Sequence, residues 1–124
     1  MTDAREMVLL VDDETLVRMA AADLLEEAGC RVIEAACADE ALQWLTADPG
    51  AIEVLVTDVH MPGSMDGLDL ARVVVHRQWP WIRLIVVSGL RGYSDRDLPD
   101  HGRFVAKPWR IDRMVDAIAW AGHH

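Results

Sequence analysis

The chain alternates short, continuous apolar runs with segments of helical periodicity, and this alternation restricts the fold more than any other feature. Strong runs occupy residues 8–11, 54–56 and 84–87, and weaker ones lie at 32–33 and 104–105. An apolar run without polar alternation is typical of a parallel strand covered by helices on both faces. Strands that alternate with helices at this spacing imply right-handed crossovers. We therefore predict an α/β fold, a doubly wound sandwich with five parallel strands.

Segments between the runs repeat apolar residues at helical spacing. The clearest covers 17–28 and is followed by Gly29, a residue suited to a left-handed C-cap. The positions expected to be buried are Val17, Ala20, Ala21, Leu24, Leu25 and Ala28; then Ala38, Ala41, Leu42 and Leu45; then Leu70, Ala71 and Val74; and finally Ile111, Met114, Val115 and Ile118. No such stripe lies between Ser88 and Lys107. We therefore expect a fourth helix there to be short or replaced by a loop.

Chain length, net charge and cysteine spacing exclude several classes of function. With 124 residues we expect one domain over 1–124, without an output domain. The net charge of −9 disfavours direct binding to nucleic acid or anionic membranes. The polar N-terminus and the absence of an apolar run of about 20 residues favour a cytoplasmic protein. Cys30 and Cys37 have no metal-ligand spacing, so both are expected to be packing residues.

Polar side chains follow four of the predicted strands. Asp12 and Asp13 follow the first, Asp58 the third, Ser88 the fourth and Lys107 the fifth. The carboxyl ends of parallel strands meet at one edge of an open sheet, where functional sites lie. Three carboxylates crowded there would raise one another's pKa unless a cation shares the space. Hard carboxylate oxygens without a Cys or His cluster favour Mg²⁺.

The acidic loop after the first strand also restricts the substrate. A resting nucleotide or flavin phosphate would need a Gly- or Ser-rich loop there, and the acidic pair has the opposite charge. We therefore expect a phosphoryl group in transfer. An aspartate beside Mg²⁺ can attack such a group and form an acyl phosphate. Lys107 would neutralise phosphoryl oxygens, and the Ser88 hydroxyl would donate a hydrogen bond to one of them.

Four motifs resemble those of the receiver domain of two-component response regulators, in the CheY-like superfamily, and they occur in the same order along the chain as in that domain. They are Val-Asp-Asp-Glu at 11–14, Val-Thr-Asp-Val-His-Met-Pro-Gly-Ser-Met-Asp-Gly at 56–67, Val-Ser-Gly at 87–89 and Phe-Val-Ala-Lys-Pro at 104–108. The resemblance spans nearly the whole chain. It implies a flavodoxin-like (βα)5 fold with strand order 2-1-3-4-5.

The resemblance also implies a role for each matching residue. Asp58 would be the phosphoacceptor and become 4-aspartylphosphate. The Mg²⁺ ligands would be Asp13 directly, Asp12 largely through water, Asp58 and the backbone carbonyl of His60. Ser88 would be the switch hydroxyl, Lys107 the lysine of the site and Phe104 the switch aromatic. The His60 side chain either tunes the lifetime of the acyl phosphate or faces solvent, and the sequence leaves both readings open.

The resemblance implies protein partners: a histidine kinase or phosphotransfer protein as donor and a downstream protein as target, with the chain a monomer or weak dimer. It also implies that the chain is no enzyme beyond its own phosphorylation and dephosphorylation. Two alternatives stand beside it, a Mg²⁺-dependent small-molecule phosphatase or phosphotransferase and a phosphorylation-independent binding module. Phosphatases of that class generally have a second acidic residue two positions after the nucleophile, and here His60 occupies that position after Asp58.

Tryptophan accounts for most of the aromatic residues, with 5 Trp beside one Tyr and one Phe. Trp109 follows the Lys-Pro pair and is expected to pack in the core. Trp120 lies nine positions beyond Ile111, on the side of the last helix opposite its apolar stripe. We therefore expect Trp120 to be exposed, and a role as a partner anchor stays open.

Overall fold

A computed structural model describes residues 6–61, 63, 65–77, 79–89, 98 and 102–121, the side chains of 120 and 121 excepted. Its strands are β1 (Met7–Val11), β2 (Arg31–Ala35), β3 (Val54–Asp58), β4 (Arg83–Ser88) and β5 (Gly102–Ala106). All neighbouring strands pair in parallel, in the order β2-β1-β3-β4-β5. The five predicted strands and the flavodoxin-like strand order are therefore confirmed.

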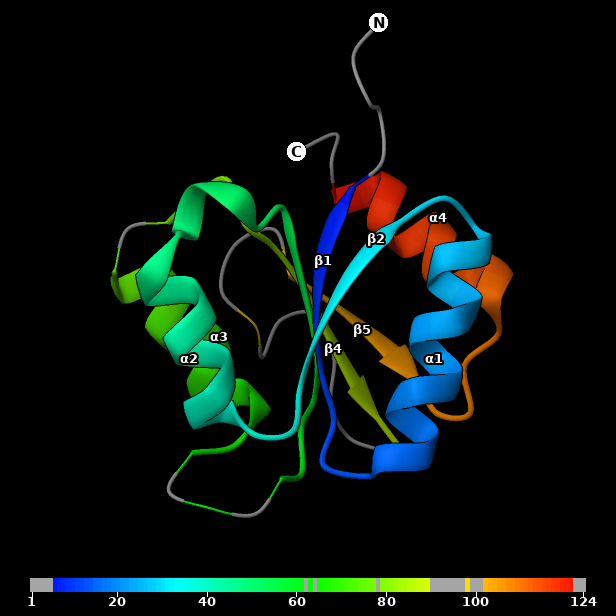
Figure 1. The fold of residues 1–124 in the computed structure, drawn as a ribbon, viewed down its shortest axis with the longest axis horizontal. Coiled ribbons are helices and arrows are strands. Elements are labelled where there is room, and N and C mark those ends of the chain that lie inside the picture. The colour runs from blue at the N-terminus through cyan, green and yellow to red at the C-terminus, as the bar shows by residue number, and fades with distance from the viewer. Residues whose placement is uncertain are drawn as a thin grey trace, which may run out of the picture.

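Helices cover both faces of this sheet (Figure 1). The described helices are α1 (Thr15–Glu27), α2 (Ala38–Ala47), α3 (Gly67–His76) and α4 (Ile111–Ala121), with a 3₁₀ turn at Pro49–Ala51. Leu9 and Val11 of β1 belong to the core cluster shared with α2 and α3, whereas Val8 and Leu10 belong to the one shared with α1 and α4. Successive residues of a strand point to opposite faces, so one apolar run supplies both cores.

The structure corrects the buried face predicted for α1. The helix buries Ala21, Ala22 and Leu25, whereas Val17 is 45% exposed and Leu24 is 41% exposed. The predicted positions Ala20 and Ala28 are also exposed. Apolar residues spread over a wide arc of this helix, because Leu16 and Met19 are exposed as well. Periodicity alone therefore does not set its rotation, and the small alanines are the residues that pack against the sheet.

Most of the positions predicted to be buried in the other helices are buried, whereas Leu42 and Ile111 are half-buried. Ala38, Ala41 and Leu45 of α2 and Leu70, Ala71 and Val74 of α3 are buried. In α4, Met114 and Ile118 are buried, but Val115 is 36% exposed, contrary to the prediction. Gly29 has φ +100°, the left-handed conformation that its position predicts.

Several expectations concern residues outside the described part of the chain. The prediction of a short or missing helix between Ser88 and Lys107 falls mainly on 90–97 and 99–101, and that of an exposed Trp120 falls on a side chain that is not described. Cys30 and Cys37 are free and half-buried, and Cys30 packs against the core cluster shared with α1 and α4, as predicted for it. None of the described helices has the length and apolar character needed to cross a bilayer.

Candidate metal and phosphoryl site at the strand ends

The structure brings the three acidic residues together at the carboxyl edge of the sheet. Asp12 follows β1, Asp13 comes next, and Asp58 ends β3. Each offers a carboxylate oxygen, and these oxygens lie within 4.8 Å of one another. The side chains of Asp58 and Asp12 are only 12% and 10% exposed, and Asp13 is exposed. Adjacent strands β1 and β3 therefore hold the acidic cluster half inside the protein.

Lys107 reaches this cluster from the end of β5. Its Nζ donates to Asp58 Oδ2 at 2.5 Å and lies 3.8 Å from Asp12 Oδ2. Its backbone N–H donates to the Ser88 carbonyl at 2.9 Å, and its peptide bond to Pro108 is cis. Burial works against the charged amine, but the hydrogen bond and charge of Asp58, helped by Asp12, raise the pKa of Lys107 above its usual value. Lys107 is therefore an ammonium beside Asp58 at neutral pH.

Asp12 is fixed by its own hydrogen bonds. Its backbone N–H donates to the Ala35 carbonyl at 3.1 Å, and its Oδ1 accepts from the Glu14 N–H at 2.9 Å. Burial raises the pKa of Asp12, and the charges of Asp58 and Asp13 add to this, while the Glu14 N–H and Lys107 oppose it. The net effect is a carboxylate that carries its charge less readily than usual.

This donor set fits a hard divalent cation. Asp12, Asp13 and Asp58 supply hard oxygens at a spacing that one ion can bridge, and Lys107 balances only part of their charge. A Mg²⁺ ion binds through one or two carboxylates while keeping several waters, which suits a cluster with one exposed member. These carboxylates would hold the ion, which would lower their mutual repulsion and favour the approach of a phosphoryl group.

Burial of Asp12, together with its acidic neighbours, predicts that the stability of the metal-free protein depends on pH. Because the pKa of Asp12 is raised on folding from 3.8, its contribution to stability is present at low pH and is lost as pH rises through the raised value. Asp12→Asn removes the free-energy cost of holding a charged carboxylate at this buried position above that pH. In EDTA, we expect the variant to gain stability over wild type as pH rises from about 4 to about 7.

Thermal unfolding at several pH values measures this difference. Asp23→Asn, at an exposed position of α1, is the matched control and should show a smaller pH-dependent difference. Adding Mg²⁺ should then stabilise wild type more than Asp12→Asn, because a ligand stabilises the state that binds it. A gain in stability that does not change with pH would contradict the role given to the Asp12 charge.

The backbone around Asp58 is held by a close approach that the sequence did not reveal. Thr57 Oγ1 donates to the Asp58 carbonyl at 3.0 Å, and the N–H of Gly67, the first residue of α3, donates to the Val59 carbonyl at 2.9 Å. A Cβ on Gly67 would lie 2.0 Å from the Asp58 carbonyl oxygen. Asp66 caps α3 through a reciprocal capping box with Asp69, a signal readable as Asp-x-x-Asp before an apolar run.

The remaining predicted residues lie on β4, on β5 and just after β3. Ser88 is buried at the end of β4 and is in register with Ala106. Phe104 is half-buried and packs against the small core cluster of Val59, Val86 and Leu98. His60 lies two residues beyond Asp58 and is exposed. Ser88 therefore ends β4 at the carboxyl edge of the sheet, Phe104 lies within β5, and His60 follows β3.

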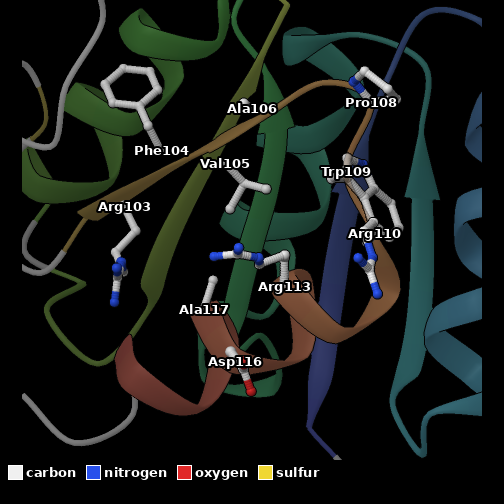
Figure 2. A pocket seen from close by; sticks show the side chains of 10 residues that line it. All are labelled: Arg103, Phe104, Val105, Ala106, Pro108, Trp109, Arg110, Arg113, Asp116 and Ala117. Carbon is white, nitrogen blue, oxygen red and sulfur yellow. The ribbon is translucent and has the colours of Figure 1, made fainter.

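In the part of the chain that the structure describes, Trp109 lines two cavities. One is small and is lined by Asp12, Asp58, Lys107 and Trp109, together with apolar residues that belong mainly to the core cluster shared with α1 and α4. The other, of about 550 Å³, lies between β5 and α4 and is lined by basic side chains that include Arg103 and Arg113. Figure 2 shows Val105 in this groove, with Phe104 pointing to the opposite side of β5. Trp109 therefore lies between the acidic site and a basic groove that the sequence did not predict.

Comparisons with known proteins place this geometry in a family. The family model of the response regulator receiver domain matches residues 8–119. The chain is 34% identical to the hydrogenase transcriptional regulatory protein HoxA of Cupriavidus necator, over 98% of this chain and 25% of that protein. It is 36% identical to the sensor kinase CckA of Brucella abortus, over 90% of this chain and 12% of that protein. The chain thus spans a quarter or less of these relatives.

Solved structures agree with the family match. The receiver domain of the hybrid histidine kinase CckA has 31% identity and a TM-score of 0.78, covering 94% of this chain and 98% of that one. A response regulator receiver domain protein from Clostridium thermocellum has a TM-score of 0.81 at 24% identity, covering 95% and 94% of the two chains, which shows the fold alone. With its strand order and its match over residues 8–119, the chain belongs to the response regulator receiver domain family, the phosphoacceptor domains of two-component signalling.

Proposed function

We propose that this receiver accepts its phosphoryl group on Asp58 from the phosphohistidine of a histidine kinase or phosphotransfer protein. The observation that supports this assignment is the position of Asp58: it ends β3 beside two other carboxylates and is ion-paired to Lys107 at 2.5 Å. Among these carboxylates only Asp58 touches the lysine so closely, since Asp12 is 3.8 Å from it. Asp58 therefore has an adjacent ammonium ready for phosphoryl oxygens.

The transfer requires one bond to form and one to break. A carboxylate oxygen of Asp58 forms a bond to phosphorus while the phosphorus–nitrogen bond of the phosphohistidine breaks, and the leaving imidazole takes a proton from solvent. Lys107 exchanges its contact with Asp58 Oδ2 for one with the transferred group, whose charge it partly neutralises. Hydrolysis later breaks the new bond with water and returns the carboxylate and inorganic phosphate.

The cation belongs to the same proposal. Asp12, Asp13, Asp58 and the backbone carbonyl of His60 would hold Mg²⁺, which when bound supplies charge compensation for the phosphoryl oxygens. The donor set supports this, because the three carboxylates offer oxygens within 4.8 Å of one another.

The proposed output is contact with a downstream protein. Ser88 would donate its hydroxyl to the phosphoryl group, and Phe104, half-buried on β5, would turn further inward. Both residues lie on strands that end at the acidic site, so a new charge on Asp58 acts on several strand ends at once. The chemistry would be limited to the chain's own phosphorylation and dephosphorylation.

Incubation with acetyl phosphate and Mg²⁺ tests this function. We expect intact mass to show one phosphoryl group per chain, lost again after the donor is removed, and no label in EDTA. Continuous release of phosphate in large excess over the chain would instead indicate a small-molecule phosphatase. A chain that takes up no label with Mg²⁺, while remaining folded by circular dichroism, would be a phosphorylation-independent module and would overturn the proposal.

A further inference from the structure

Arg18 is the one basic residue of α1, and its guanidinium is turned inward toward the acidic loop. Its Nη1 donates to the backbone carbonyl of Asp12 at 2.8 Å, and its Nε donates to Glu34 Oε1 at 3.1 Å. The Arg18 side chain is only 14% exposed, on a helix whose apolar residues Leu16 and Met19 face outward. The planar guanidinium group of Arg18 therefore links α1, the end of β1 and strand β2.

The contact with the Asp12 carbonyl has a specific geometric consequence. This carbonyl lies in the peptide plane that joins Asp12 to Asp13, and the plane is rigid. Fixing the oxygen therefore orients the chain between two of the three clustered carboxylates. The Asp12 N–H is already fixed to Ala35, so the Arg18 contact fixes the other side of the same residue.

Glu34 in turn holds the guanidinium in place. It is in register with Leu10 on the edge strand β2, and its carboxylate is 38% exposed. Arginine's rigid fork lets one side chain satisfy a carboxylate and a carbonyl at once, which a lysine does not do with the same geometry. Groups that orient metal ligands in this way change metal affinity when they are removed.

From these contacts we propose that Arg18 is a positioning residue for the cation site, and that Glu34 orients it. The inference rests on the proposed function, because it assumes that the clustered carboxylates bind Mg²⁺. The direction of the change in Mg²⁺ affinity on removing Arg18 distinguishes positioning from a simple charge effect. Removing a positive charge near an acidic cluster would by itself tighten Mg²⁺ binding, whereas loss of positioning weakens it.

The experiment compares Mg²⁺ affinity in wild type, Arg18→Gln and Arg18→Lys. Trp109 lines the cavity with Asp12 and Asp58, so tryptophan fluorescence reports binding, and calorimetry provides a second readout. We expect the Kd for Mg²⁺ to rise about tenfold in Arg18→Gln and to recover in part in Arg18→Lys. At saturating Mg²⁺, labelling by acetyl phosphate should return to nearly the wild-type rate, because the defect lies in affinity.

The matched control is Arg72→Gln, at an exposed arginine of α3 that pairs with Asp69 at 3.3 Å. It should leave the Kd unchanged. On a Glu34→Ala background, Arg18→Gln should have a smaller effect than in the wild type, because the two residues act as one unit.

Outcomes separate this inference from the proposed function. If wild type neither binds Mg²⁺ nor takes up label, the proposed function fails. If wild type does both, but Arg18→Gln binds Mg²⁺ as tightly as wild type or more tightly, Arg18 is not a positioning residue. Equal weakening in Arg18→Gln and Arg72→Gln would also overturn the inference. A lower melting temperature with an unchanged Kd would show a purely structural role, which is likewise contrary to it.

Discussion

Asp58→Asn is expected to reduce phosphoryl incorporation from acetyl phosphate to background. The substitution keeps the size and planar shape of the side chain, and its amide oxygen can still accept the Lys107 hydrogen bond seen at Asp58 Oδ2. It removes the anionic oxygen that we propose as the nucleophile toward phosphorus, and a neutral amide does not replace a carboxylate nucleophile. Intact mass after incubation with Mg²⁺ and the phosphodonor measures the result.

Two controls make the Asp58 result specific. Asp48→Asn changes an exposed aspartate at the end of α2 and should be labelled like wild type. Circular dichroism should show that Asp58→Asn remains folded, because the substitution changes no side-chain volume in the core. Stoichiometric label on Asp58→Asn would mean that the acceptor is another residue, with the other members of the acidic cluster as the first candidates.

Gly67→Ala is expected to destabilise the protein by about 2 kcal/mol or more and to slow phosphoryl uptake. The new Cβ would lie 2.0 Å from the Asp58 carbonyl oxygen and 2.8 Å from its carbonyl carbon. Neither atom belongs to a flexible side-chain end, so α3 or the end of β3 has to shift. Alanine favours a helix over glycine by about 1 kcal/mol, which offsets only part of the overlap. Denaturant unfolding and the rate of labelling measure the two effects.

Gly50→Ala is the matched control for this substitution. Its nearest contact would be Asp48 Oδ1 at 3.8 Å, an ordinary van der Waals distance. The change should leave labelling unaffected and alter stability little. If Gly67→Ala were as stable as wild type, the close approach between α3 and Asp58 would not be a real constraint of the fold.

Part of the site could be predicted because it depends on local sequence and on a general property of parallel sheets. Asp12, Asp13, Asp58 and Lys107 each follow an apolar run, and strand ends in such a sheet converge on one edge. The convergence of these residues on one edge follows from the strand order once that order is known, and the structure gives the distances, within 4.8 Å among the carboxylates and 2.5 Å between Lys107 and Asp58. Residue identity and position along each strand were sufficient to predict which side chains share this edge of the sheet.

The supporting contacts could not be predicted in the same way. The rotation of α1 leaves Leu24 exposed and turns Arg18 inward, although the apolar pattern favoured a different face. That pattern is broad, so many rotations bury similar apolar area, and the choice depends on how alanines fit against the strands. The hydrogen bond from the Arg18 guanidinium to the Asp12 carbonyl and the close approach of Gly67 to Asp58 both follow from such packing.

The amino-acid sequence by itself determined the five strands, the acidic residues at their ends and the sign of the charge there, because periodicity and residue chemistry are local properties. Only the tertiary structure decided which helix face is buried, which arginine holds the Asp12 carbonyl and which glycine makes room for Asp58. These contacts join residues on different elements, and their geometry depends on the packing of the whole domain.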